Sequence, residues 1–291
     1  MTVGQRIVAN SAGTARPRLA APRDACDCHL HVYDPAFPMA RPDARAVSDA
    51  SAAEYRALQA RLGTSRAVVV QPAAYGTDNR VTVDAVGKLG REHARGIAVI
   101  HPDVGDTDLR RMTDAGIRGV RFTQHDPRTA VTTPEMIEPV AARVAALGWH
   151  VQIHLLATQI VALRDVLLRL PGTIVLDHMA RLPQPEGTSH AAWDIVKKLL
   201  DTGRAWVKLS GAYLESREGP PRYSDVLQVA RAFVAHAPER CVWGSDWPHP
   251  TERDAKPDDA VLFDLLGEWA GDEGMRQRIL VENPRALYGF S

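Results

Sequence analysis

Short apolar runs of strand type recur along the chain, and longer segments with a helical pattern separate them. Eight such runs predict strands at Ala25–Tyr33, Arg66–Ala73, Gly96–Pro102, Gly119–Gln124, His150–Leu156, Thr173–Ala180, Ala205–Gly211 and Arg240–Pro248. The intervening segments predict helices at Ala52–Leu62, Thr82–His93, Thr107–Ala115, Pro134–Leu147, Gln159–Leu170, Ala191–Thr202 and Tyr223–His236, with a closing helical region at Asp258–Leu287.

This alternation predicts an α/β fold with a parallel sheet, and eight is the number of strands that closes a TIM (β/α)8 barrel. An open doubly wound sheet is the alternative, but no Gly-x-Gly-x-x-Gly follows the first strand and the sequence has no phosphate-loop motif. Residues 1–22 show no clear period and predict an N-terminal tail, or an arm packed over the barrel end. Residues 23–291 are then expected to form a single barrel domain.

Polar side chains near the carboxyl ends of these strands are the strongest indication of a functional site. A buried parallel strand is expected to be apolar throughout, and an unpaired polar group buried there costs about 1–3 kcal/mol. Active sites of such barrels lie at the carboxyl ends of the strands. Nearly every predicted strand carries a polar group at that end: His29, His31, Gln71, His101, Arg121, Gln152, His154, His178, Lys208, Ser210 and Asp246.

The first and last strands supply the best candidates for a metal or for acid–base chemistry. His29 and His31 are separated by one residue, so both imidazoles point to the same side of a strand. Two nitrogen ligands of one metal ion would be arranged in this way. Asp246 lies in Trp-Gly-Ser-Asp-Trp-Pro, which is not the setting of a solvated surface charge. This carboxylate could cap the following helix, but its place at a strand end favours a metal ligand or a general base.

Asp177 and His178 are neighbours on the sixth predicted strand. Successive side chains of a strand alternate between its two faces, so only one of the pair is expected to face the barrel interior. We assign the interior to His178, because Ile174 and Leu176 then share its face as core. Asp177 would instead hold a neighbouring loop or helix.

Basic residues near the strand ends suggest an anionic ligand. Arg121 either pairs with a barrel carboxylate or presents its planar guanidinium to a substrate carboxylate. Arg128 and Arg217 lie in loops after the fourth and seventh strands, where surface positions are common, but either could join Arg121 around an anion. Lys208 is an anion partner or a buried structural lysine, and the sequence leaves both open.

Two tyrosines after strands predict a pocket wall or lid, namely Tyr75 after the second strand and Tyr213 after the seventh. The predicted substrate-binding set is Arg121, His154, Gln71, Arg128, Arg217 and Tyr75.

Composition narrows the class of protein. Lys+Arg and Asp+Glu both number 35 in the 291 residues, and this zero formal charge does not favour a nucleic-acid partner. Cys26, Cys28 and Cys241 lie in apolar, strand-like runs and are expected to be buried thiols rather than a disulfide framework. The sequence has no apolar stretch of signal-peptide or membrane-span length, so a cytoplasmic enzyme without a membrane partner is expected.

Taken together, several motifs resemble those of the amidohydrolase-related (amidohydrolase 2) family, most closely its 2-pyrone-4,6-dicarboxylate lactonase branch. The motifs are Asp-Cys-His-Leu-His, Val-Gln-Pro, Gly-Val-Arg-Phe, Leu-Asp-His, Val-Lys-Leu-Ser-Gly, Trp-Gly-Ser-Asp-Trp-Pro-His and Asn-Pro-Arg-Ala-Leu-Tyr-Gly-Phe. The resemblance extends from about Asp24 to Phe290. It is specific for the branch and not for a substrate.

The resemblance implies a distorted barrel in which His29, His31, His178 and Asp246 occupy catalytic positions. His154 falls on the fifth-strand position that is histidine in metal-dependent members. Arg121 stands near the position of a Lys or Glu that bridges two metals elsewhere, so a binuclear centre is not expected. One divalent ion, zinc foremost, would be held by His29, His31 and Asp246, with His154 as a further candidate. A metal-free mechanism is the alternative, with the same histidines forming a cradle for the oxyanion.

The sequence thus predicts ring-opening hydrolysis of a small anionic lactone such as 2-pyrone-4,6-dicarboxylate, a muconolactone or a sugar-acid lactone. Asp246 would activate water as general base, and His178 would donate to the carbonyl oxygen. Whether Asp246 is ligand, base or both stays open. A lactone isomerase and a metal-dependent decarboxylase of the same superfamily are the rival enzymes. A binding barrel without catalysis is the other alternative, and a homodimer is compatible with the chain.

Overall fold

The computed structural model describes residues 7–40, 47–126 and 128–291, and its centre is a sheet of eight parallel strands. They are β1 (Cys26–Leu30), β2 (Arg66–Val70), β3 (Ala94–Ala98), β4 (Ile117–Thr123), β5 (His150–His154), β6 (Ile174–Leu176), β7 (Ala205–Leu209) and β8 (Cys241–Trp243). Each strand pairs with the next along the chain. A parallel bridge between Leu30 and Trp247 joins the two ends of the sheet, so the predicted (β/α)8 barrel is confirmed.

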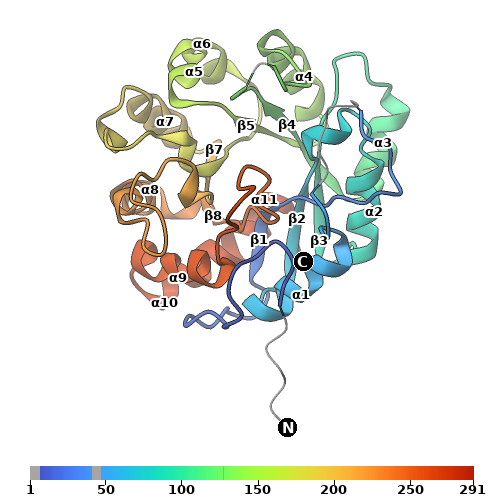
Figure 1. Ribbon diagram of the computed structural model, residues 1–291. Coiled ribbons are helices and arrows are strands. Elements are labelled where there is room, and N and C mark those ends of the chain that lie inside the picture. The colour runs from blue at the N-terminus through green and yellow to red at the C-terminus, as the bar shows by residue number, and fades with distance from the viewer. Residues whose placement is uncertain (1–6, 41–46, 127) are drawn as a thin grey trace.

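Helices surround the ring of strands (Figure 1). They are α1 (Ala52–Leu62), α2 (Arg80–Leu89), α3 (Asp106–Asp114), α4 (Ile137–Ala145), α5 (Ala157–Ala162), α6 (Arg164–Arg169), α7 (Ala192–Asp201), α8 (Leu227–His236), α9 (Asp259–Ala270), α10 (Glu273–Gln277) and α11 (Asn283–Tyr288). The helix predicted at Thr82–His93 begins earlier and stops at Leu89, where Gly90 takes a positive φ of 94°. The helix predicted at Gln159–Leu170 is divided at Leu163 into α5 and α6.

Two apolar cores lie on the two faces of the strands. Val68 and Val70 belong to the smaller core inside the barrel, whereas Ala67 and Val69 belong to the larger core between the sheet and the helices. This division follows from the alternation of side chains along a strand. Cys26 and Cys28 are buried in the inner core, and the expectation of buried free thiols is confirmed for all three cysteines.

The last residues of the chain close the amino-terminal end of the barrel. Tyr288 and Phe290 pack in the inner core, and the guanidinium groups of Arg95 and Arg66 lie 4.5 and 5.3 Å from the centre of the Phe290 ring. Arg95 also donates to the Tyr288 carbonyl over 3.1 Å. These aromatic side chains therefore close this end of the barrel.

The N-terminal arm is described from residue 7 onward, and residues 1–6 lie outside the described residues. It runs along the barrel near α1, α9 and the loop after β8. The Trp247 indole donates to the Ala9 carbonyl over 2.8 Å, Arg61 donates to the Ser11 hydroxyl over 3.1 Å, and Val8 is buried. These contacts bring the arm to the end of the barrel where the strands finish.

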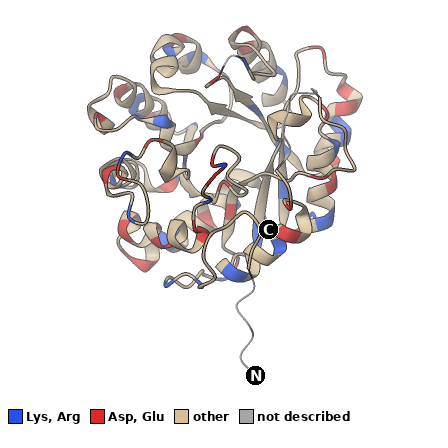
Figure 2. Cartoon of the chain, in the orientation of Figure 1, with Lys and Arg blue, Asp and Glu red and all other residues tan. Residues whose placement is uncertain are grey.

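Positive and negative side chains are interspersed on the outer helices (Figure 2). In the part of the chain that the structure describes, no helix combines the length and the apolar character that a membrane crossing requires.

Gly244 sets how closely the loop after β8 approaches β1. A Cβ at this position would lie 2.6 Å from the His29 Cβ and 2.8 Å from the His29 nitrogen. Gly244→Ala is therefore expected to lower the free energy of unfolding by about 1–3 kcal/mol, because the loop must move away from the strand. Urea denaturation measures this change.

Gly87→Ala is the matched control, since Gly87 lies in α2 with no neighbouring atom within 4 Å of the new Cβ. It should raise stability by about 0.5–1 kcal/mol, as alanine is the better helix former. Equal midpoints for Gly244→Ala and the wild type would show that the close approach does not constrain the loop.

Candidate active site

A cavity of about 550 Å³ opens at the carboxyl ends of the strands. Its polar lining includes His31, Arg121, His154, His178 and Asp246, each at or just after the end of a different strand. Loop residues and Asn10 from the N-terminal arm complete the lining. The barrel thus collects side chains from distant parts of the sequence around one space, as its topology requires.

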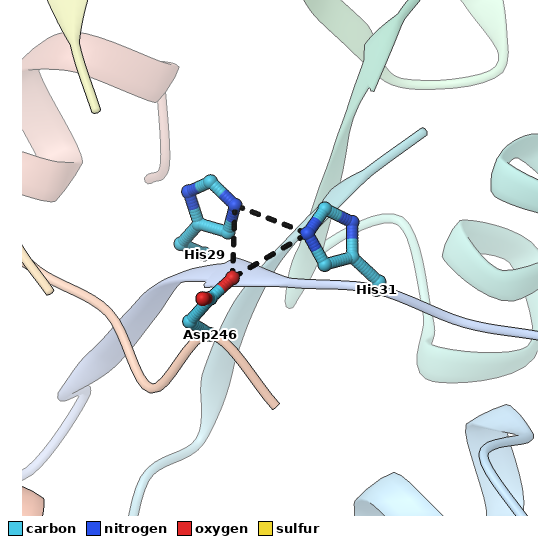
Figure 3. Close-up of side chains that lie close together, drawn as sticks. All are labelled: His29, His31 and Asp246. Atoms are coloured by element: carbon cyan, nitrogen blue, oxygen red, sulfur yellow. Dashed lines mark hydrogen bonds and ion pairs between the residues drawn. The ribbon is translucent and has the colours of Figure 1, made fainter. Parts of the chain in front are cut away.

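His29, His31 and Asp246 form a compact cluster beside this cavity (Figure 3). The two Nε2 atoms are 3.3 Å apart, and each lies 3.5 Å from Oδ1 of Asp246. His29 is fully buried, and His31 and Asp246 are at most 4% exposed. Two imidazole nitrogens and one carboxylate oxygen therefore converge on one point.

The backbone explains why Asp246 lies next to β1. The Asp246 nitrogen donates to the His29 carbonyl, and the His31 nitrogen donates to the Trp247 carbonyl, both over 2.8 Å. The loop after β8 is thus hydrogen-bonded to β1 almost as a further stretch of strand. Asp246 has a φ of 63°, in the left-handed region that aspartate tolerates better than most residues.

Hydrogen bonds set which nitrogen of His31 faces the cluster. Its Nδ1 lies 2.8 Å from the Val70 carbonyl oxygen, which can only accept, so Nδ1 carries the proton. Nε2 then faces His29 and Asp246, and in the neutral ring its lone pair is available to an ion. Nδ1 of His29 lies 3.3 Å from Oδ1 of Asp177 and 3.3 Å from Nζ of Lys208.

The cluster has the dimensions of a tetrahedral metal site. Zinc binds histidine nitrogen and carboxylate oxygen at about 2.0–2.2 Å, which places two ligand atoms about 3.3–3.6 Å apart. The three measured separations of 3.3, 3.5 and 3.5 Å match this spacing. Asp177 beside His29 and the Val70 carbonyl beside His31 are outer partners of the kind that orient metal-bound histidines.

His154 is not a member of this cluster. Its Nδ1 lies 3.0 Å from a terminal nitrogen of Arg121, and its Nε2 lies 3.1 Å from a terminal nitrogen of Arg181. Among the described residues, the groups able to hold a metal do not include it. The structure therefore does not support the prediction of His154 as a fourth ligand, because both ring nitrogens already face guanidinium groups.

Asp177 is the centre of a buried ionic network. Its Oδ2 accepts from Nε of Arg121 over 2.8 Å and from the side-chain amide of Gln152 over 3.0 Å. Its Oδ1 lies 3.3 Å from His29 and 3.7 Å from Nζ of Lys208. Burial would raise the pKa of Asp177, but Arg121, His29 and Lys208 outweigh it and lower this pKa well below its usual value.

The prediction that only His178 of this pair serves the interior is wrong. The rule of alternation does not reach these residues, because β6 ends at Leu176 and His178 has a φ of 49°. The chain turns there into a short helical segment, His178–Arg181. Asp177 consequently points into the barrel while His178 lines the cavity above it.

Lys208 takes the structural role that the sequence had left as one of two alternatives. Its Nζ donates to the Cys28 carbonyl over 2.8 Å and to Oε1 of Gln152 over 2.7 Å, and the side chain is fully buried. Burial lowers the pKa of Lys208 to about 8, although Asp177 opposes the shift. The ammonium group therefore ties β7 to β1 and β5 beneath the cavity, away from a substrate.

His178 and Asp246 differ in charge at neutral pH. Burial lowers the pKa of His178 to about 4, so its imidazole is neutral near pH 7. Its Nδ1 lies 2.9 Å from the Ser210 hydroxyl, and donation by this hydroxyl leaves the proton on Nε2. Burial would raise the pKa of Asp246, but His178, His31 and His29 outweigh it and lower the pKa well below its usual value.

Comparison with known proteins places this site in a family. Residues 26–290 match the sequence profile of the amidohydrolase family. The chain belongs to the amidohydrolase family. Its match thus includes all eight strands of the barrel.

Relatives of this amidohydrolase are known under several activities. It is 37% identical to a 2-pyrone-4,6-dicarboxylate hydrolase of Comamonas testosteroni, over 95% of this chain and 94% of that protein. It is 34% identical to a D-galactarolactone isomerase of Agrobacterium fabrum, over 98% and 97% of the two chains. A ligand-free crystal structure from Agrobacterium tumefaciens superposes with a TM-score of 0.89 at 32% identity, covering 97% of this chain and 99% of that chain.

Four residues predicted to bind substrate do not line the cavity of this amidohydrolase. Arg128 is 89% exposed and pairs with Asp126, and Arg217 is exposed on a loop. The amide of Gln71 holds its own loop through the Gly76 and Asp78 carbonyls. The hydroxyl of Tyr75 bonds to the backbone of Asp34. His101 is another polar residue near a predicted strand end. Its Nε2 lies near the Val131 carbonyl, and it does not line the cavity either.

Sequence reasoning missed several residues that surround the site. Arg181 lies between Glu215, at 2.5 Å, and His154. Its position three residues after His178 was the available signal. Lys256 and Asn10 line the cavity from a loop and from the arm. Their segments carry no periodic pattern, so nothing in the sequence indicated that either would reach the site.

The network around Asp177 generates a prediction about stability. Asp177→Asn removes the buried negative charge and leaves Arg121 and Lys208 as buried cations. The free energy of unfolding is expected to fall by about 3–5 kcal/mol, because uncompensated buried charges are costly. Urea denaturation at neutral pH checks this.

Asp126→Asn is the matched control, since Asp126 pairs with the largely exposed Arg128. It is expected to leave the midpoint nearly unchanged, because exposed ion pairs contribute little. Equal losses in both variants would contradict the central role of Asp177.

Proposed function

We propose that this amidohydrolase opens the ring of a carboxylate-bearing lactone with a water molecule activated by Asp246. One observation carries the proposal: an ionised, buried carboxylate lies 3.5 Å from two histidine nitrogens, beside a cavity that is otherwise lined by cations and neutral groups. Such an arrangement holds water beside a base and stabilises negative charge that develops on a carbonyl oxygen.

The charges of the cavity favour an anionic substrate. Arg121, Arg253 and Lys256 line it, and Asp246 is the one carboxylate among the described lining residues. Arg121 is held rigidly, because Asp177 fixes its Nε and His154 faces one of its terminal nitrogens. Its guanidinium is thus preorganised for a substrate carboxylate, which binds such a planar group through charge-assisted hydrogen bonds.

The chain's own groups account for each proton in the reaction. Asp246 takes a proton from water as the water oxygen attacks the lactone carbonyl carbon. Nε2–H of His178 donates to the carbonyl oxygen, where negative charge develops. The ring C–O bond then breaks as protonated Asp246 returns its proton to the former ring oxygen, which becomes a hydroxyl group. The new carboxylic acid ionises, so one carboxylate and one proton are released for each turnover.

We further propose that His29, His31 and Asp246 hold one zinc ion, as their spacing supports. A bound zinc ion lowers the pKa of water toward about 7 and polarises a carbonyl group. Oδ1 of Asp246 is the oxygen that faces the two histidines, so this carboxylate would bind the ion through one oxygen only.

Relatives support the lactone as substrate class, since one is a 2-pyrone-4,6-dicarboxylate hydrolase and another a D-galactarolactone isomerase. A lactone isomerase is the second candidate function, and the similarity to the latter enzyme favours it. Isomerisation replaces the attacking water by a hydroxyl group of the substrate itself. Because no new carboxylate forms, it releases no titratable acid, and a decarboxylase would instead release carbon dioxide.

Asp246→Asn provides the test of the proposed base. Turnover of a carboxylate-bearing lactone should fall by about 10³-fold or more, because an amide cannot accept the proton from water. Proton release, followed by titration at constant pH across pyrone, muconolactone and sugar-acid lactones, measures the rate. Calorimetry with the same lactones should show that binding is retained.

Wild-type conversion of these lactones without acid release would replace hydrolysis by isomerisation. Full activity of Asp246→Asn would remove Asp246 as the base.

Elemental analysis of the purified protein tests the metal. About one zinc per chain is expected, with hydrolysis lost on chelation and restored by added zinc. His31→Ala should lose this zinc, because it removes one of three ligands. Metal-free protein with full activity would instead assign the histidines to oxyanion stabilisation.

A further inference from the structure

Asp246 has a second partner on the side away from the histidines. The Tyr213 hydroxyl donates to Oδ2 of Asp246 over 2.6 Å, while Oδ1 faces His29 and His31. Tyr213 follows β7 and does not line the cavity. Its direct link to the residues that line the cavity is therefore the hydrogen bond to Asp246.

A chain of side chains holds Tyr213 in turn. Its hydroxyl oxygen lies 3.0 Å from Nδ1 of His249, and Nε2 of His249 lies 3.2 Å from Oδ2 of Asp259. His249 and Asp259 are both fully buried. A tyrosine hydroxyl has one proton, so while it donates to Asp246 its oxygen can only accept from His249. The Asp259 carboxylate also only accepts, so both contacts of His249 together require an N–H on each of its ring nitrogens.

The segment that carries Asp246 needs such support. Asp246 and His249 have φ values of 63° and 54°, in the left-handed region that few residues other than glycine adopt without strain. The His249 nitrogen donates to the Asp246 carbonyl over 2.8 Å, which closes the turn. Strained segments persist when their surroundings fix them, and here the fixing groups are Tyr213 and Asp259.

We infer that Tyr213 is a positioning residue for Asp246, held in place by His249 and Asp259. By occupying Oδ2, the hydroxyl sets the rotation of the carboxylate and keeps Oδ1 turned toward His29 and His31. The inference rests on the proposed function, in which Asp246 is the base. It also explains why Asp246 presents one oxygen, and not two, to the two histidines.

Tyr213→Phe keeps the ring and deletes the hydroxyl. The kcat for lactone hydrolysis should fall about 10–100-fold, the usual cost of losing a group that orients a catalytic ligand. KM should stay within about twofold, because Tyr213 does not touch the substrate. An unchanged kcat, or a loss confined to KM, would overturn the inference.

Thr82→Val is the control for the general loss of a buried hydroxyl. The buried Thr82 donates its hydroxyl to Oε1 of Gln71 over 2.6 Å, and neither residue lines the cavity. Its kcat should equal that of the wild type even where its melting temperature falls as much as that of Tyr213→Phe. A similar fall of kcat in both variants would contradict the specific role of Tyr213.

A double variant tests the chain behind Tyr213. His249→Gln alone should lower kcat, whereas adding it to Tyr213→Phe should lower kcat no further, because His249 acts through the missing hydroxyl. Multiplied losses in the double variant would show that His249 acts independently and would overturn that part of the inference.

A crystal structure of Tyr213→Phe gives a readout that does not depend on activity. The Asp246 carboxylate should be rotated or occupy more than one orientation. A carboxylate that keeps the native orientation would overturn the inference even if kcat falls. Wild-type protein that converts no lactone would remove the proposed function, while this structural comparison would still decide whether Tyr213 positions Asp246.

Discussion

The backbone junction between β1 and the loop after β8 is the constraint on which the site depends. Two hydrogen bonds, from Asp246 to His29 and from His31 to Trp247, join segments more than two hundred residues apart in sequence. The same two bonds complete the ring of strands and place the carboxylate beside the imidazoles. Closure of the fold and assembly of the site are therefore one event, since neither can occur without the other.

Beneath this junction, the charged groups buried inside the barrel neutralise one another. Asp177 neutralises Arg121 and Lys208, and this allows a polar layer to persist between the apolar inner core and the cavity. Within this layer the Arg121 guanidinium lines the cavity, whereas the Lys208 ammonium bonds to neighbouring strands. Groups that face the cavity are thus held by groups that do not, an arrangement that preorganises a site.

Periodicity predicted the barrel and all eight strands, because apolar runs and their spacing are local properties. The polar positions at the strand ends indicated where the site lies, and the resemblance to the amidohydrolase-related family implied the grouping of His29, His31 and Asp246. Prediction failed where the chain leaves a strand. Alternation gave the wrong face for Asp177, because β6 ends one residue earlier. Loop positions also failed, since Arg128 points away while Asn10, from an arm without any period, reaches the cavity.

The aromatic plug at the opposite end has a consequence for synthesis of the chain. The Phe290 ring contacts Arg66 and Arg95, which are made more than a hundred and ninety residues earlier. Until translation has passed Phe290, the inner core stays open to water at that end and these two arginines lack their aromatic partner. A growing chain can form its early strand–helix units in order, but the finished interior must wait for Tyr288 and Phe290.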